Sequence, residues 1–298
     1  MLSECLALTG RYRSALFPSS PSSTTCSRRR LFPVVVQARA IRTSSNSAGS
    51  MRFAFPPPST PPYVRVAGST DNPLFFPVHR IYCVGRNYAD HTREMGGDPD
   101  REQPFFFTKP ADAVVETNRQ IPYPMATNNL HHEVELVVAL KSGGTSLSVE
   151  QAMDHVFGYA VGLDLTRRDL QNYAKEHRQP WDTSKAFDHS APIGSITPLE
   201  GTDSSSSSSS LTSSSILSKA AHISLQVNGQ TRQSGTIDQM IWSIPEIISI
   251  LSHQFVLAPG DLIFTGTPAG VGPLVPGDQV KGRIDGLEDI DITIGAST

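Results

Sequence analysis

The sequence predicts a mixed α+β fold in which β-strands dominate, and three observations lead to this class. Short apolar or alternating segments of strand length recur along the body of the chain. Segments with helix-start signals are few and short. Clusters of glycine and proline separate these segments, as turn residues do. Strands with sparse helices between such turns favour a β-dominated α+β domain.

The expected strands share an apolar run or a period-two alternation, and they are residues 81–84, 105–107, 133–140, 158–165 and 262–264. Ile223, Leu225 and Val227 alternate up to Asn228-Gly229, a dipeptide typical of the tight turn of a β-hairpin. We therefore expect a hairpin that turns at residues 228–229.

The expected helices follow pairs of capping residues. Ser148 with Gln151 precedes a helix at 149–155, Thr166 with Asp169 precedes one at 167–177, and Ser243 with Glu246 precedes one at 244–253. A further short helix is expected within residues 88–95.

The first 50 residues differ sharply in charge from the rest of the chain. Residues 1–50 contain seven arginines, no lysine and one acid, a net charge of +6, so the remainder carries −9 of the total of −3. Arginine among serine and threonine with almost no acid is typical of an organellar transit peptide, with mitochondrion preferred to plastid. Met51 is a candidate alternative start that gives a cytosolic form. An ordinary disordered tail is the alternative interpretation.

Composition divides the remaining chain. Residues 51–75 are proline-rich and are expected to form an extended linker or an early strand. Residues 202–215 are serine-rich, and such a tract buries too little apolar surface to order itself. We interpret this tract as a loop inserted within one catalytic domain, residues 76–298, although a linker between two domains is the alternative.

Several function classes are disfavoured by composition. The acidic body is a poor match for nucleic acid, and no run of 18 apolar residues exists that could span a bilayer. Cys83 is the only cysteine of the body, so no internal disulfide is expected there and a reducing compartment fits. A small anionic substrate remains compatible, because a few local cations can reverse the field within a pocket.

Three carboxylates are candidate metal ligands. In a strand, Glu133 and Glu135 project from the same face, and two such carboxylates remain ionised together when a cation lies between them. Asp164 ends an apolar strand and is placed to complete the set. Oxygen ligands without cysteine or histidine point to Mg²⁺ or Mn²⁺. The alternatives are an edge strand with exposed glutamates and, for Asp164, a helix cap.

Other polar residues are candidates for catalysis and binding. His91 and Glu94 lie three apart on a short helix, where a carboxylate orients an imidazole as a general base, or where both form an ordinary surface pair. Lys109, Arg168 and Lys185 either neutralise a carboxylate or enolate or are exposed to solvent. The glycine-rich residues 265–273 lack the ending of a phosphate loop, so nucleotide binding is rejected.

Together and in this order, these segments resemble the fumarylacetoacetate hydrolase family, nearest to its acylpyruvase and fumarylpyruvate hydrolase group. The resemblance covers about residues 75–294 and is carried by Tyr82-Cys83-Val84-Gly85-Arg86-Asn87-Tyr88-Ala89-Asp90-His91, by Lys109-Pro110, and by residues 129–136, 162–171, 184–188, 260–261 and 266–272. The leader and the serine-rich insert depart from the family pattern without touching these motifs.

The resemblance implies a β-roll of packed mixed sheets, usually a homodimer, and a set of site residues. Glu133, Glu135 and Asp164 match the Mg²⁺ or Mn²⁺ ligands. His91 and Glu94 match a water-activating pair on a lid helix, and Lys185 matches a lysine beside the substrate. Arg86, Lys109, Gln171 and Thr267 match positions that line the pocket, and Arg168 is a further candidate for substrate binding.

The implied activity is hydrolysis of the C–C bond of acylpyruvates such as fumarylpyruvate and acetylpyruvate, giving pyruvate and a carboxylic acid. The alternative at the same site is oxaloacetate decarboxylation or enol–keto tautomerisation, because both reactions pass through a stabilised enolate. A metal-independent binding or scaffolding protein of this fold would need a broken ligand set, and the set is intact in this sequence.

Overall fold

The computed structural model describes residues 54–56, 60–68, 72–96, 103–199, 217–218 and 220–297. The chain divides into two units, Met1–Ala54 and Phe55–Thr298, and the second is described below. The predicted transit peptide (1–50), the candidate start at Met51 and the serine-rich insert (202–215) lie outside the described residues.

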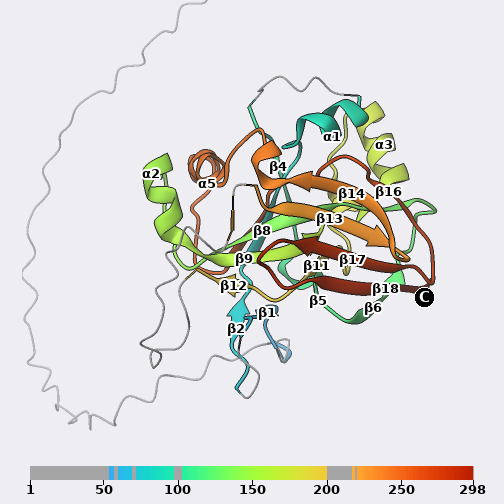
Figure 1. The fold of residues 1–298 in the computed structure, drawn as a ribbon, viewed down its shortest axis with the longest axis horizontal. Helices are drawn as coiled ribbons and strands as arrows, with labels where there is room; N and C mark the ends of the chain where they lie inside the picture. The colour runs from blue at the N-terminus through green and yellow to red at the C-terminus, as the bar shows by residue number, and fades with distance from the viewer. Residues whose placement is uncertain are drawn as a thin grey trace, which may run out of the picture. The chain divides into compact units, whose positions relative to one another are not determined.

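An eight-stranded mixed sheet forms the centre of the second unit (Figure 1). Its order is β4 (Phe106–Lys109), β3 (Arg80–Val84), β15 (Asp261–Phe264), β8 (Val134–Leu140), β9 (Val156–Leu163), β11 (Ala191–Ile193) and β5 (Val114–Glu116), with β12 (Thr197–Pro198) paired to β9. Strands β3 and β15 run parallel, whereas β8 runs antiparallel to both β15 and β9. The ends of β3, β15 and β9 and the start of β8 therefore meet at one edge of the sheet.

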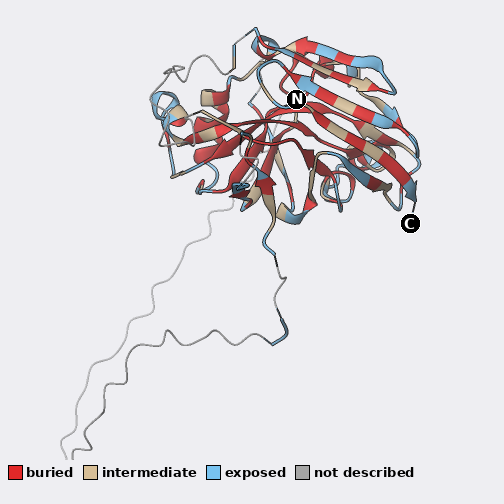
Figure 2. Cartoon of the chain, turned by 60° about the horizontal axis from the view of Figure 1, so that its bottom comes forward, coloured by how far each residue is buried: buried red, intermediate tan, exposed pale blue. Residues whose placement is uncertain are grey.

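A second sheet of five strands packs on this one. Its order is β14 (Gln230–Thr236), β13 (His222–Val227), β17 (Gln279–Ile284), β18 (Ile290–Ser297) and β6 (Arg119–Tyr123). Leu136 and Val138 of β8 join Ile223 and Leu225 of β13 in the larger hydrophobic cluster. The alternate residues of β8 face a second cluster, so every residue of this strand is buried, as Figure 2 shows for the central strands.

Smaller elements complete the fold. β7 (Leu130–His132) pairs with β10 (Thr166–Arg167) and β16 (Gly272–Leu274), and β1 (Tyr63–Arg65) pairs with β2 (Phe75–Pro77). The helices are α1 (Ala89–Glu94), α2 (Val149–Ala152), α3 (Arg168–His177), α4 (Asp182–Lys185) and α5 (Ile244–Ser252), with 3₁₀ turns η1 (Ala111–Ala113), η2 (Met153–His155) and η3 (Ile237–Gln239). No helix among the described residues is long and apolar enough to cross a membrane.

Most local predictions are confirmed. The fold is β-dominated, and the helices predicted at 167–177, 244–253 and within 88–95 lie within one or two residues of their expected bounds, whereas the helix predicted at 149–155 is α-helical only to Ala152 and continues as the 3₁₀ turn η2. The hairpin of β13 and β14 turns at Asn228 and Gly229, which both have positive φ, as a type I′ turn requires. The capping boxes at Ser148 and Ser243 both form.

The capping box predicted from Thr166 and Asp169 is wrong. Thr166 lies in β10, where its hydroxyl donates to the Asp164 carbonyl and accepts from Lys185. The Asp169 carboxylate instead accepts from the Thr127 hydroxyl at 2.6 Å. Helix α3 therefore begins without a side-chain cap, because both residues are taken by partners distant in sequence.

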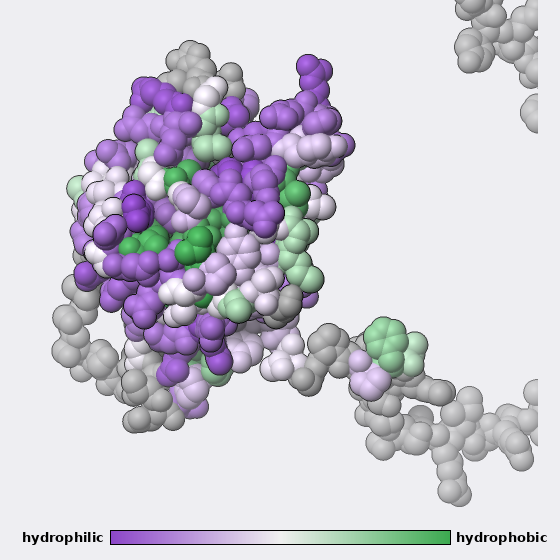
Figure 3. Space-filling model, turned by 90° about the vertical axis from the view of Figure 1, so that its right-hand side faces the viewer, coloured by the Kyte–Doolittle hydropathy of each residue, from purple (hydrophilic) through white to green (hydrophobic). Residues whose placement is uncertain are grey.

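The side of the second unit that carries α3 and the ends of β16 and β18 is mainly hydrophilic (Figure 3). Hydrophobic side chains gather near the middle of this view and along its right flank.

Candidate active site and metal centre

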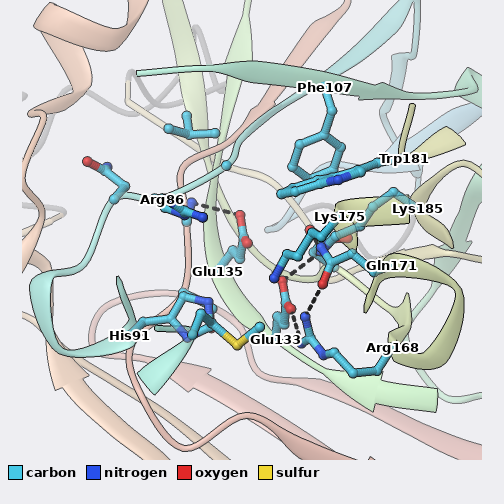
Figure 4. A pocket seen from close by; sticks show the side chains of 17 residues that line it. Arg86, His91, Phe107, Glu133, Glu135, Arg168, Gln171, Lys175, Trp181 and Lys185 are labelled. Atoms are coloured by element: carbon cyan, nitrogen blue, oxygen red, sulfur yellow. Dashed lines mark hydrogen bonds and ion pairs between the residues drawn. The ribbon is translucent and has the colours of Figure 1, made fainter. Parts of the chain in front are cut away.

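A cavity opens at the sheet edge where β3, β8, β9 and β15 meet, and most of the predicted site residues line it (Figure 4). The lining includes Arg86, His91, Glu133, Glu135, Asp164, Arg168, Gln171, Lys185 and Thr267. Two predicted residues lie just behind this wall: Glu94 touches His91, and Lys109 touches Asp164. The strand order explains the gathering, because segments more than 100 residues apart in sequence end side by side at this edge.

The three predicted metal ligands form one buried cluster. Glu133, Glu135 and Asp164 each place a carboxylate oxygen within 4.8 Å of the other two. Glu133 and Glu135 flank Val134 at the start of β8, so their side chains point the same way. The amide of Asp164 donates to the Glu133 carbonyl at 2.9 Å, which fastens the end of β9 beside the start of β8.

Cations neutralise two of these carboxylates. Glu133 accepts hydrogen bonds from Arg168 and, at 2.8 Å, from Lys185. Asp164 accepts from Lys185 at 2.6 Å and pairs with the Lys109 ammonium at 2.8 Å. Arg168 and Lys185 are therefore not exposed to solvent but belong to the cluster.

Glu135 differs from the other two carboxylates of the cluster. Its carboxylate accepts a hydrogen bond from the backbone N–H of Gly266 at 2.8 Å and forms no ion pair within the described part of the chain. Burial, and then the charges of Asp164 and Glu133, raise the pKa of Glu135 well above its usual range. Burial opposes ionisation of Glu133 as well, but Lys185 and Arg168 hold the pKa of that carboxyl well below its usual range.

This imbalance fits a divalent cation. A metal ion among the three carboxylates compensates the charge that Glu135 carries without a partner. Oδ1 of Asp164 is buried 2.8 Å from the Lys109 ammonium but accepts no hydrogen bond from it, because Lys109 donates to the carbonyls of Leu165 and Lys185. Oxygen donors of this kind suit a hard cation. The residues present therefore fit the metal that the sequence predicted.

His91 and Glu94 face this cluster from helix α1. Nδ1 of His91 lies 3.1 Å from Glu94 Oε2, and the backbone N–H of Gly270 donates to both oxygens of Glu94 at 3.2 Å. Figure 4 shows the imidazole across the cavity from the helix that carries Arg168 and Gln171. With its Nδ1–H given to Glu94, His91 presents the lone pair of Nε2, as a general base must.

The protonation state of His91 gives a testable pH dependence. Burial lowers the pKa of His91 below 6.5, and both Glu133 and the hydrogen bond to Glu94 act in the opposite direction. Any reaction that uses neutral His91 as base is therefore expected to hold its rate down to below pH 6.5. Because Glu94 raises this pKa, Glu94→Gln is expected to shift the acidic limb of the kcat/KM profile to lower pH. The same variant is expected to lower the maximal kcat/KM that is reached when His91 is neutral. A limb that moves to higher pH would contradict this orienting role.

Sequence reasoning missed three residues of the site. Lys175 and Trp181 line the cavity, and Lys175 lies four residues after Gln171 on α3, so helical spacing could have revealed it. Gln233 is buried on β14 and donates to the Thr267 hydroxyl at 2.7 Å and to the Pro268 carbonyl at 2.8 Å. Its own carbonyl accepts from the backbone of Val134, so Gln233 fastens the glycine-rich loop to β8. Nothing in the sequence near Gln233 signals this role.

Comparison with known proteins agrees with this geometry. The model of the fumarylacetoacetate (FAA) hydrolase C-terminal domain matches residues 80–294. A fumarylpyruvate hydrolase from Ralstonia sp is 42% identical over 203 residues, which cover 67% of this chain and 98% of that protein. A mitochondrial oxaloacetate tautomerase from Mus musculus is 42% identical over 207 residues, covering 70% of this chain and 87% of that one.

A solved structure is similar over most of the chain as well. It is that of fumarylpyruvate hydrolase from Pseudomonas aeruginosa in complex with Mn²⁺ and pyruvate, with 48% identity and a TM-score of 0.74. The match covers 83% of this chain and the whole of that one. The sheets, the carboxylate cluster and the His–Glu pair therefore have one explanation: the chain belongs to the fumarylacetoacetate hydrolase family.

Proposed function

We propose that this chain hydrolyses the C–C bond between the two carbonyl-bearing halves of an acylpyruvate such as fumarylpyruvate. The observation that carries this proposal is the buried imidazole of His91, paired with Glu94 and facing a carboxylate cluster in one cavity. A cluster of carboxylates alone serves many reactions, but an oriented base beside it supplies the activated water that hydrolysis needs. The similarity to the fumarylpyruvate hydrolases of Ralstonia and Pseudomonas supports the same reaction.

His91, Glu94 and Lys185 have separate roles in this reaction. His91 takes a proton from water, and Glu94 holds the imidazole in the orientation that this transfer needs. The water oxygen attacks the distal carbonyl carbon, and the C–C bond breaks with its electron pair passing to the pyruvate half as an enolate. Lys185 supplies positive charge beside this enolate. The proton on His91 then returns to the enolate carbon, so that water is consumed and pyruvate and an acid leave.

The metal ion is proposed to be Mg²⁺ or Mn²⁺, one per chain, held by Glu133, Glu135 and Asp164. The three ligand side chains offer only oxygen, which either ion accepts. When bound, such an ion serves as a Lewis acid and template for the 2-oxo acid end of the substrate. The Mn²⁺ named for the Pseudomonas structure supports this choice.

Oxaloacetate tautomerisation or decarboxylation is the second candidate function. One reason is the similarity to the mouse oxaloacetate tautomerase. The other is the positive charge of Lys185 beside Glu133 and Asp164, since these reactions need a stabilised enolate but no attacking water. The test is turnover of fumarylpyruvate, acetylpyruvate and oxaloacetate by the Mn²⁺-loaded enzyme. We expect at least one acylpyruvate to be cleaved faster than oxaloacetate is turned over. Fast turnover of oxaloacetate with no cleavage of either acylpyruvate would make the second function the right one.

We also propose that residues 1–50 direct the chain to mitochondria and that the folded unit forms a homodimer. The arginine-rich, acid-poor leader supports the first point, and the family resemblance supports the second. Fluorescent fusions that begin at Met1 and at Met51 should differ, with the longer one in mitochondria and the shorter one in the cytosol. Light scattering should give twice the mass of one chain, and a monomer would contradict the dimer.

A further inference from the structure

Two cations that line the cavity form no ion pair with any acidic residue that the structure describes. Lys109, Arg168 and Lys185 each contact a carboxylate of the cluster. Arg86 and Lys175, by contrast, line the cavity and form no ion pair within the described part of the chain. Figure 4 shows both side chains directed into the cavity from opposite sides. Two such charges at the wall of one cavity are costly unless a ligand neutralises them.

Aromatic rings hold these two cations in place. The guanidinium of Arg86 lies 5.9 Å from the ring centre of Phe105, and the ammonium of Lys175 lies 5.7 Å from that of Trp181. Phe105 and Trp181 contact each other edge to face at 5.3 Å. The two cations therefore rest on one aromatic pair, which limits the freedom that each side chain would lose on binding an anion.

The net charge of the cavity also favours an anionic ligand. Four positive side chains line it against three carboxylates, a net charge of +1, and Glu94 and Lys109 behind the wall cancel each other. A divalent cation raises this to +3, and the carboxylate of a 2-oxo acid lowers it only to +2. Burial, and then the charges of Arg168 and Arg86, lower the pKa of Lys175 to about 8.

We infer that Arg86 and Lys175 bind the distal carboxylate of a substrate that carries one acid at each end. This inference rests on the proposed function, because the 2-oxo acid end is taken to lie at the carboxylate cluster. A dicarboxylate such as fumarylpyruvate then satisfies both ends of the cavity. Acetylpyruvate, which ends in a methyl group, leaves the two cations without a partner and is the poorer substrate.

The kinetic test compares the two substrates in each variant. Lys175→Met is expected to lower the ratio of kcat/KM for fumarylpyruvate to that for acetylpyruvate by at least about tenfold, the usual effect of losing one hydrogen bond to a charged group. Lys175→Arg, which keeps the charge, is expected to retain most of the ratio. The control is Lys281→Met, which removes a lysine of β17 paired with Asp289 and should leave the ratio unchanged. An unchanged ratio in Lys175→Met would overturn the inference.

A binding test separates this inference from the proposed reaction. The probes are 2-oxoheptanedioate and 2-oxoheptanoate, which match fumarylpyruvate in chain length but lack the carbonyl that is attacked. Calorimetry on the Mn²⁺-loaded enzyme is expected to show at least about tenfold tighter binding of the dicarboxylate, and Lys175→Met should remove this difference. Equal affinities in the wild type would overturn the inference even if fumarylpyruvate is cleaved. A clear preference without cleavage would leave the inference standing and would overturn the proposed reaction.

Discussion

Glu135→Ala is expected to weaken binding of Mn²⁺ or Mg²⁺ by at least about 10²-fold and to abolish every activity of the site. Glu135 is the carboxylate that Lys and Arg leave unneutralised, so its charge is the one most available to a metal ion. Calorimetric titration of the metal into the metal-free protein measures the loss directly. Glu176→Ala is the matched control, since Glu176 is exposed on α3 and should bind metal as the wild type does.

Stability distinguishes loss of the metal from loss of the fold. A carboxyl whose pKa is raised in the folded state destabilises that state when it is ionised, so Glu135 costs stability at pH 7 in the absence of metal. Glu135→Gln, which keeps the shape of the side chain, is therefore expected to match or exceed the wild type in Tm without metal. The wild type should gain in Tm on addition of Mn²⁺, whereas the variant should not. Metal binding of wild-type strength in either variant would contradict the assigned ligand set.

His91→Ala is expected to separate the two candidate reactions. Loss of the base should lower acylpyruvate hydrolysis by at least about 10²-fold, the lower end of what a general base contributes. Oxaloacetate tautomerisation should retain a larger fraction of its rate, because no water attacks carbon in that reaction. His177→Ala is the control, since His177 lies exposed at the end of α3, where it contacts the carbonyl and the ring of Tyr173. Equal and modest losses for all substrates would mean that His91 merely shapes the cavity wall.

The shared direction of Glu133 and Glu135 could be predicted because it is a local property of an extended chain. Two glutamates at positions i and i+2 share one face of a strand whatever the rest of the chain does. The His91–Glu94 pair follows in the same way from the spacing of a helix. What the sequence could not show by itself is that these two local arrangements face the same cavity, since that depends on the pairing of β3 with β15 across about 180 residues.

The roles of the cations could not be predicted from the residues alone. A lysine at the end of a strand is exposed by default, yet Lys109 is buried and holds Asp164 from behind the cavity wall. Thr166 has the pattern of a helix cap, but Lys185, 19 residues later, takes its hydroxyl. In both cases a charge brought in by tertiary packing outweighs the local preference. The role of Gln233 could not be predicted either, because its partners lie far away in the sequence, on β8 and in the glycine-rich loop.

Isotope labelling tests directly whether water attacks the distal carbonyl carbon. Fumarylpyruvate is incubated with the Mn²⁺-loaded enzyme in H₂¹⁸O, and the fumarate formed is analysed by mass spectrometry. Attack by water predicts one ¹⁸O atom in one carboxylate of each fumarate, in equal amount to the pyruvate released. Pyruvate release with unlabelled fumarate, or turnover of oxaloacetate with no fumarate from fumarylpyruvate, would contradict it.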